Sequence, residues 1–395
     1  MLPLSVGFGV AGLLALAAAA ASLSGSPLSP GARELSDLPS AAFLAAAAAA
    51  LALYALALYL LRRRRSHVLA VCAVAAAIQL VPLAGPLVLS RDVYAYWAYG
   101  RLTADHHANP YAVAPARYAA DPATRAMASG WRGAATVYGP AFSAASAGLA
   151  QATGRSVETA AFVYRLLAAL GMLAAVALVA LTAPLPAFAA AFVGWNPLLA
   201  LDFAGGGHND VWMAVFALAA VALASRRPGA SGATWAVAAG VKWTALALLP
   251  LSLLQARGRD RRRAALGFAL AAGAIAAGAF LLFGSGWLSA LGPVAHRHAR
   301  FALPTRLGEV GLPRWAADIV ALAPLAVASP WLVRSARAGR PRLALTTILL
   351  LLASPWVLPW YAAWAVPFAA VEEDRLAWAL SLALCAYLLP DRVPV

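Results

Sequence analysis

The chain has 395 residues, of which 63% are hydrophobic and only 11% are charged, and its formal net charge is +15. Soluble domains are about a quarter charged, and any globule in water must expose a large share of its surface. This composition excludes a water-soluble globular protein and indicates an integral membrane protein.

The apolar segments have the length and composition of membrane helices. A bilayer core of about 30 Å is crossed by about 20 helical residues. The segments are rich in Ala and Leu and show no alternation of polar and apolar residues, which argues against a β-barrel. We therefore predict an all-α polytopic protein with about ten to twelve transmembrane helices. The apolar segments are 2–22, 41–61, 67–89, 136–153, 158–182, 185–202, 211–225, 232–255, 264–284, 315–333, 343–371 and 376–390.

The positive charge is carried by arginine clusters between these segments, such as Arg62 to Arg65 and Arg257 to Arg263. Short cytoplasmic loops of membrane proteins are enriched in arginine and lysine. We therefore interpret the positive charge as a sign of which loops face the cytoplasm, and we expect no nucleic-acid partner. With the first cluster in the cytoplasm, residues 90–135 form a first large outer loop. Residues 285–314 form a second outer loop within a single transmembrane domain, 1–395.

Two apolar segments conflict with a simple count of crossings. Arginine clusters flank 232–255 on both sides, and 185–202 would have to begin and end outside. Both are expected to be re-entrant or broken helices, because irregular backbone at membrane depth is tolerated only inside protein or beside a watery cavity. The alternative is a misplaced segment boundary.

Asp92 follows directly after an apolar segment and opens the first outer loop. A partly desolvated carboxylate at this depth suits a general base; the alternative is a helix cap or an ion pair with Arg91. The aromatic residues that follow fit an amphipathic helix on the membrane surface, or they stack on a sugar ring. From this loop we take Tyr94, Arg101 and Tyr138 as candidate substrate-binding residues.

Three glycines, 205–207, precede His208, Asn209 and Asp210 in an otherwise apolar context. Ionisable groups at membrane depth are functional candidates. Two ligands at this spacing are a weak metal signal, so we expect the trio to bind hydroxyl groups, with Asp210 as a second candidate catalytic carboxylate. The alternative is a glycine hinge with Asp210 capping the next helix.

Lys242 is the only lysine and lies inside an apolar segment. Its ammonium needs an anionic partner such as a phosphate or Asp202, unless it reaches the interface. Further candidates are a basic group in the second outer loop and two aromatics beside a proline. These are His296, His298, Arg300, Arg306, Trp360 and Tyr361. Arginine suits phosphate and the aromatics suit a sugar, but a solvated loop and interface anchors are the alternatives.

Five short motifs occur in an order that resembles a known family. They are Arg91 to Arg101, Asn109-Pro110-Tyr111, Tyr138-Gly139-Pro140, Asn196-Pro197 and Gly206 to Asp210. Together they resemble the polyprenol-phosphomannose-dependent α-1,6-mannosyltransferases of actinobacteria, which are glycosyltransferases of the GT-C class. These enzymes make lipomannan and related mannans of the cell envelope.

The resemblance implies a GT-C-like helical bundle in the plasma membrane with an active site on the outer face. It implies a polyprenyl phosphate sugar as donor and a glycan or glycolipid as acceptor, with Asp92 as the general base of an inverting transfer. No cofactor is expected; a divalent metal is possible but not required. The alternatives are a GT-C transferase for another polyprenyl-phosphate-linked sugar, and a flippase or transporter of lipid-linked sugars, although the internal repeats common in transporters are not evident.

Overall fold

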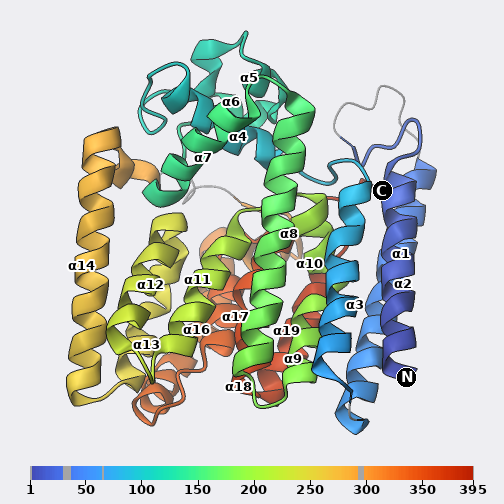
Figure 1. The fold of residues 1–395 in the computed structure, drawn as a ribbon, viewed down its shortest axis with the longest axis vertical. Coiled ribbons are helices and arrows are strands. Elements are labelled where there is room, and N and C mark those ends of the chain that lie inside the picture. The colour runs from blue at the N-terminus through green and yellow to red at the C-terminus, as the bar shows by residue number, and fades with distance from the viewer. Residues whose placement is uncertain (1, 30–36, 65, 292–297, 395) are drawn as a thin grey trace. The chain divides into compact units, whose positions relative to one another are not determined.

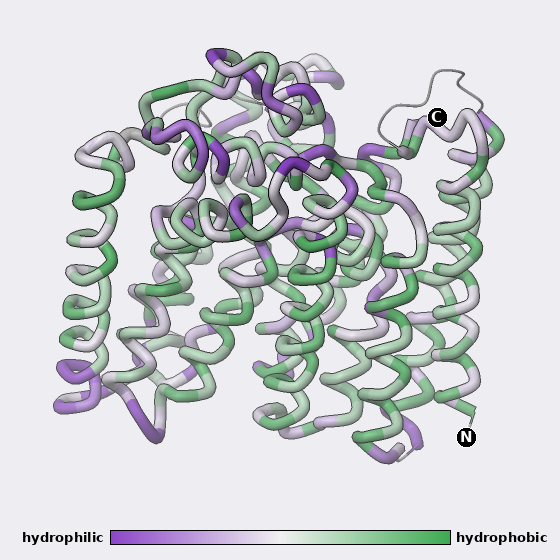
Figure 2. The backbone as a smooth tube through the Cα atoms, turned by 45° about the horizontal axis from the view of Figure 1, so that its top comes forward, coloured by the Kyte–Doolittle hydropathy of each residue, from purple (hydrophilic) through white to green (hydrophobic). Residues whose placement is uncertain are grey.

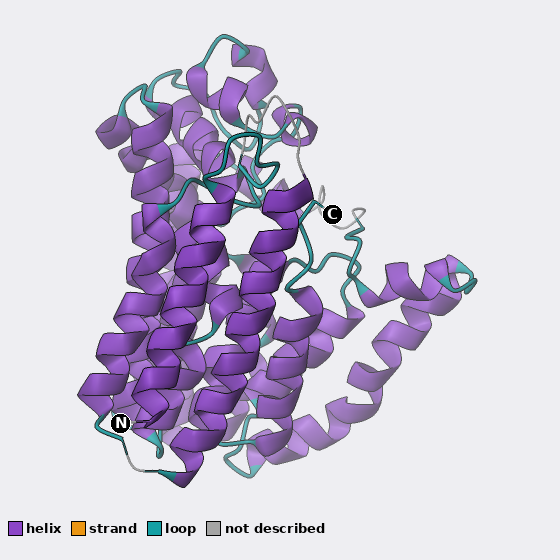
Figure 3. Cartoon of the chain, turned by 90° about the vertical axis from the view of Figure 1, so that its right-hand side faces the viewer, coloured by secondary structure: helices purple, strands orange, loops and turns teal. Residues whose placement is uncertain are grey.

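The computed structural model describes residues 2–29, 37–64, 66–291 and 298–394. Every regular element in these ranges is helical, and none is a strand (Figure 3). The chain divides into two compact units. Unit 1 comprises Met1–Ser90, Tyr164–Val211 and Val357–Val395, and unit 2 comprises Arg91–Val163 and Trp212–Trp356. The single transmembrane domain expected from the sequence stays a prediction.

Unit 1 is a bundle in which α1 packs along α2, and α3 and α18 pack against α9 (Figure 1). Its helices are α1 (Leu2–Ala21), α2 (Asp37–Arg63), α3 (Val68–Leu80), α8 (Val157–Thr182) from Tyr164 onward, α9 (Pro186–Gly194), α10 (Pro197–Ala200), α18 (Val366–Glu372) and α19 (Arg375–Leu388). The short turns η1 (Val81–Ala84), η3 (Leu201–Gly205, π-helical) and η6 (Pro359–Trp364) connect them.

Unit 2 begins with the segment predicted to be the first outer loop and continues into a second group of helices. In it, α4 packs on α7, α12 on α14, and α16 on α17. Its helices are α4 (Asp92–Ala104), α5 (Pro122–Ala126), α6 (Ser129–Arg132), α7 (Pro140–Thr153), α11 (Asp210–Leu223), α12 (Pro228–Val241), α13 (Leu249–Gln255), α14 (Gly258–Phe283), α15 (Leu303–Glu309), α16 (Arg314–Arg337) and α17 (Leu343–Ala353). Its short turns are η2 (Pro115–Tyr118), η4 (Trp243–Ala247) and η5 (Gly286–Leu291).

Five helices of the described chain, α1, α2, α8, α14 and α16, are long and apolar enough to cross a membrane, and a bent pair raises the number to six. Each of the other apolar segments found in the sequence coincides with a shorter or interrupted helix. Hydrophobic colour runs along the helices, and hydrophilic colour gathers at the turns between them (Figure 2). On α14 and α16, Leu281 and Val327 are more than four-fifths exposed, as expected for side chains that face lipid. The prediction of an all-α polytopic membrane protein is confirmed.

The two segments expected to be broken are interrupted, and a third segment is interrupted as well. Segment 185–202 bends by 51° between α9 and α10. Segment 232–255 is divided at Lys242, which has an extended backbone between α12 and η4. In segment 343–371, α17 ends at Ala353 and helical structure resumes only at Pro359.

Side chains from other helices bind the backbone at the bend between α9 and α10. The hydroxyl of Tyr54 on α2 donates to the carbonyl of Phe192 at 2.6 Å, and the amide of Gln79 on α3 donates to that of Gly194 at 3.0 Å. The indole of Trp195 donates in return to Val71 on α3 at 3.0 Å. The last carbonyls of a helix have no hydrogen-bond partner within that helix. These bonds therefore satisfy carbonyl groups that would otherwise lack a donor in an apolar medium.

The crossing of α12 and α14 depends on the absence of a side chain at Gly232. A Cβ atom there would lie 1.8 Å from the carbonyl oxygen of Ala264 on α14. Membrane helices usually associate through close backbone approach at small residues. The hydrophobic effect does not drive their association, because the lipid tails are as apolar as the side chains.

We therefore predict that Gly232→Ala destabilises the protein, because the added methyl group forces the two helices apart. Overpacking of this kind costs about 1 to 3 kcal/mol. Thermal unfolding in detergent measures the effect. The matched control is Gly273→Ala on α14, where a Cβ meets nothing within 4 Å; it should leave the midpoint unchanged or raise it. Equal midpoints for the two variants would contradict the tight crossing.

Candidate functional site

The candidate residues are divided between the two units. In unit 1 the chain reaches the group of candidate residues around His208 through Asn196, which is fully buried and whose side chain accepts from the amide of Leu199 to begin α10. The π-helical turn η3 follows, and Gly207 then adopts φ +74°. Residues with a side chain rarely take this conformation. The glycine therefore allows the backbone to turn sharply between η3 and His208.

His208 lies at the centre of the unit 1 group. Its side chain is fully buried, and its ring stacks on that of Trp360 with centroids 3.5 Å apart and planes 13° apart. Tyr361 lies edge-on to Trp360 and stacks on Trp364 at 4.1 Å. Residues that are 150 positions apart in the sequence thus form one aromatic layer, which unites predicted residues of the glycine-rich segment and of the 360–361 pair.

The carboxylate of Asp210 is held by this layer. The indole nitrogen of Trp364 donates to its Oδ1 at 2.7 Å, and both Asn209 and Asp210 are buried. Asp202, on the preceding turn, is buried within electrostatic reach of Asp210. The group therefore gathers carboxylate, amide and aromatic side chains in one buried place, and these are the side-chain types that bind hydroxyl groups and the apolar face of a sugar ring.

Among the described residues, no group of three or more His, Cys, Asp or Glu side chains is arranged to hold a metal ion. Hydrogen bonding to a hydroxylated substrate remains the chemistry for which His208, Asn209 and Asp210 are suited.

In unit 2, Asp92 is the first residue of α4 and is half-buried, with Arg91 before it at the N-cap position. Negative charge is stabilised at a helix N-terminus by the helix dipole. The carboxylate of Asp92 is thus partly shielded from water at the start of α4, and its role as a general base stays a prediction.

The helix expected after Asp92 forms as α4, but Val93 to Leu102 are buried on every face because α5 and α7 pack around it. Its aromatic rings pack inside the protein. Tyr96 meets Tyr138 edge-on at 5.0 Å, and Tyr94 is also buried. The contact between Tyr96 and Tyr138 packs α4 against the residues just before α7.

Arg101 lies in a buried ionic network. Its Nε donates to both oxygens of Asp121 at 3.0 Å, and its Nη1 donates to the carbonyl of Gly154 at 2.7 Å and pairs with Asp105. His106 bonds to Asp121 at 2.9 Å. Burial raises the pKa of the Asp121 carboxyl, but hydrogen bonds from Arg101, His106 and the amide of Ala123 outweigh it and lower that pKa overall. The network joins α4 to α5, and the sequence-based role of Arg101 in substrate binding stays a prediction.

Lys242 lies at the break between α12 and η4 and is half-buried. The amide of Gly139, next to the predicted residue Tyr138, donates to the carbonyl of Val241 at 3.1 Å. This bond ties the end of the first outer loop to the residue before Lys242. The pairing of Lys242 with Asp202 stays a prediction.

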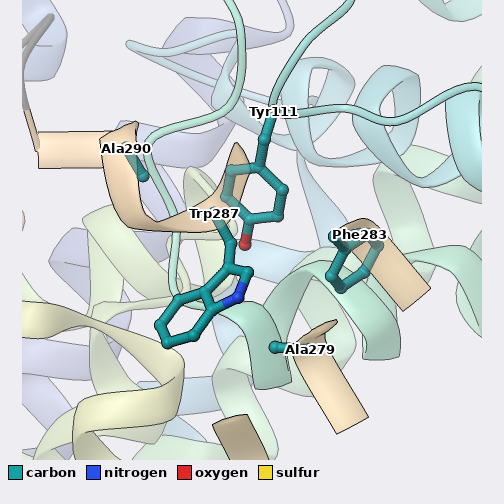
Figure 4. Packing of buried hydrophobic residues seen from close by; sticks show 5 residues of the cluster. All are labelled: Tyr111, Ala279, Phe283, Trp287 and Ala290. Atoms are coloured by element: carbon teal, nitrogen blue, oxygen red, sulfur yellow. The ribbon is translucent and has the colours of Figure 1, made fainter. Parts of the chain in front are cut away.

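An aromatic cluster follows Lys242. The ring of Trp243 stacks on that of Trp287 at 5.6 Å, and Trp287 packs with Tyr111 and Phe283 (Figure 4). The hydroxyl of Tyr111 bonds to the carbonyl of Tyr138 at 2.9 Å. The cluster fixes the Asn-Pro-Tyr turn against η5 and α14, and so anchors the first outer loop.

The basic group of the second outer loop is partly described. His296 lies outside the described residues. Arg300 and Arg306 both lie over the ring of Phe301, at 5.6 and 4.5 Å, and Arg306 also pairs with Glu309 at 2.7 Å. His298 is exposed and contacts Arg314. Two arginines therefore converge on one largely buried aromatic ring.

Sequence reasoning missed two residues that the structure connects to the unit 1 group. Trp364 comes four residues after Trp360, and this spacing next to a proline could have drawn attention to it. Arg165, on α8, binds the turn before His208. It is the only arginine in an apolar segment, and an ionisable residue at such a position is a functional candidate for that reason alone.

We predict that the network of Asp121 makes stability depend on acid pH. Because the folded-state pKa of Asp121 lies below that of the unfolded chain, its contribution is present above about pH 4 and is lost as pH falls through the folded-state value. The Tm of Asp121→Asn should therefore lie below that of the wild type at neutral pH, and the gap should narrow in acid. Thermal unfolding in detergent across this range measures it.

Asp260→Asn is the control for that series, because Asp260 is exposed and its partner Arg263 lies 3.9 Å away. Its Tm should follow the wild type throughout. A constant gap for Asp121→Asn at every pH would show that the amide disturbs packing and that ionisation of Asp121 contributes nothing.

Comparison with known proteins places the chain. Residues 6–257 match the model of a family described as alpha-(1->6)-mannopyranosyltransferase, N-terminal domain. The match covers more than half of the chain and includes Asp92, Lys242 and the segment from Gly205 to Asp210. It confirms the resemblance found in the sequence. Searches of curated proteins and of solved structures give no match.

Proposed function

We propose, since the chain belongs to the alpha-(1->6)-mannopyranosyltransferase family, that it transfers mannose from polyprenyl phosphomannose to a mannan or lipoglycan acceptor. Membership of the family makes it a mannosyltransferase with membrane-spanning helices. The lipid-linked donor, the acceptor and an active site on the outer face of the plasma membrane belong to the proposal.

One observation carries the proposal: the family match includes Asp92, and Asp92 is half-buried at the first turn of α4. A lipid-linked donor agrees with the absence of a nucleotide-binding motif in the sequence and with the membrane location. The polyprenyl tail would lie in the bilayer and the phosphate at its surface.

In the proposed reaction, Asp92 accepts the proton of the 6-hydroxyl group of the acceptor mannose. The hydroxyl oxygen attacks C1 of the donor sugar, the bond from C1 to the phosphate oxygen breaks, and polyprenyl phosphate leaves with the electron pair. Attack on the face opposite to the leaving group inverts C1, so a β-linked donor gives an α-1,6 product.

We assign the leaving phosphate to Lys242. Departure of a phosphate is accelerated by a cation placed where negative charge develops. Lys242 is half-buried at a helix break, where an ammonium is worth more than in water and favours an anionic partner. Arg306 is the other candidate for this role. Arg300 and Arg306 would then attract the anionic donor to the protein surface.

We assign hydroxyl recognition to the side chains around His208. The stacked rings of His208 and Trp360 and the carboxylate of Asp210, held by Trp364, suit the face and the hydroxyl groups of a sugar. Asp210 is therefore assigned to sugar binding and Asp92 to proton transfer.

We predict that Asp92→Ala and Asp92→Asn abolish most of the activity, because neither side chain accepts the proton. Loss of a general base lowers the rate by about 10² to 10⁴-fold. The assay uses purified protein, radiolabelled polyprenyl phosphomannose and a short α-1,6-mannoside acceptor.

The control for this pair is Asp260→Asn, an exposed carboxylate outside the candidate groups, which should retain wild-type rates. Transfer that persists in both Asp92 variants would remove Asp92 from the reaction. Transfer only from another polyprenyl phosphosugar would identify a different sugar specificity, and no transfer from any donor would favour a flippase.

We further propose that the reaction needs no divalent metal, because Asp92 and Lys242 supply the base and the cation that the scheme requires. Addition of excess EDTA to the same assay should leave the rate of transfer unchanged. A rate that falls with EDTA and returns with Mg²⁺ or Mn²⁺ would show that a metal ion takes part.

A further inference from the structure

Arg165 on α8 binds two separate turns of unit 1 at once. Its side chain is 5% exposed. Its Nε donates to the carbonyl of Ala204 at 2.7 Å, while Nη1 and Nη2 donate to Gly85 at 2.9 Å and Pro82 at 2.5 Å. One guanidinium therefore joins the π-helical turn η3 to the segment around η1.

The two turns are also bonded to each other. The amide of Val88 donates to the carbonyl of Gly205 at 3.2 Å, and a Cβ at Gly205 would meet the Val88 side chain at 2.9 Å. The position of one turn therefore fixes the position of the other, and Arg165 holds both from the same side.

Each turn leads directly into a candidate functional residue. The chain runs from Ala204 and Gly205 into His208 and Asp210, and from Gly85 through Ser90 into Asp92. A displacement of either turn is passed along a few residues of backbone to a side chain whose placement decides the rate. A misplacement of about 1 Å can lower a rate by about 10²-fold.

Only arginine suits this position. Its planar fork presents donors in several fixed directions, whereas the lysine ammonium is a single point on a flexible stem. Lysine would keep the charge and bind one or two of the carbonyls, but it could not span all three. The guanidinium thus supplies geometry in addition to charge.

We propose that Arg165 is a positioning residue for mannosyl transfer: it sets the segment before Asp92 and the segment before His208 in register with each other. The proposal rests on the proposed function. Arg165 touches backbone carbonyls in this arrangement and acts on the reaction through the two segments that it joins.

The deciding variant is Arg165→Lys, because Arg165→Ala leaves three buried carbonyls without their donor and is expected to lower the yield of folded protein. The matched control is Arg261→Lys. Arg261 also donates to three backbone carbonyls, those of Leu253, Leu254 and Ala256, but on the surface at the end of α13.

Two measurements are made on each full-length, folded protein in detergent. Hydrogen exchange followed by mass spectrometry reports on peptides covering 82–90 and 201–207, with α14 as internal reference. Steady-state transfer from polyprenyl phosphomannose gives kcat per folded molecule and KM for the donor.

For Arg165→Lys we expect faster hydrogen exchange in both peptides and an unchanged exchange rate in α14. We expect kcat to fall by about 10 to 100-fold. The donor KM should change little, because Lys242 is untouched. Arg261→Lys should match the wild type in every readout. Faster exchange with unchanged kcat would show a purely structural clamp and overturn the proposal, as would wild-type exchange in both peptides. Failure of the proposed function is recognised separately, because the wild type would then transfer no mannose while the exchange measurement still tests the clamp.

Discussion

The constraint on which this structure depends is that backbone polar groups inside a membrane protein must find partners within the protein. Straight helices meet it by themselves, and α14 and α16 can therefore expose most of their apolar surface. Broken helices do not meet it by themselves. At the bend after α9, Tyr54 and Gln79 supply the missing donors. Arg165 supplies one more donor at η3 and two around η1. The bundle of unit 1 is organised around these breaks as much as around its apolar contacts.

The same constraint explains where polar chemistry is found. A break needs buried polar side chains, and a buried polar side chain is tolerated only where it is bonded. His208, Asn209 and Asp210 follow one break, and Lys242 is itself the residue at another. Because these breaks are stabilised from neighbouring helices, their side chains are held in place before a substrate arrives, which is the condition for efficient catalysis.

Much of this arrangement could be predicted from the sequence, because it depends on residues that are close together in the chain. Apolar length gives the helices, and the arginine clusters around 232–255 together with the prolines after Ser354 give the breaks. The partners could not be predicted, because they are distant. Arg165 is 39 to 83 residues from the carbonyls that it binds, and Trp364 is 154 residues from Asp210. The surroundings of the aromatic residues after Asp92 could not be predicted for a related reason: a helix packed inside protein and a helix at a membrane surface share this composition, and the packing of α5 and α7 on α4 is not visible in it.

The boundary of the family match does not coincide with the boundary of the candidate site. The match ends at residue 257, yet the ring that stacks on His208 and the indole that holds Asp210 come from Trp360 and Trp364. Unit 1 itself is completed by residues 357–395. A chain ending at the limit of the match would keep the glycine-rich segment but leave His208 and Asp210 without these contacts, and a buried carboxylate that loses its donor is destabilised. The C-terminal part of the protein is therefore integral to sugar recognition in the proposed function.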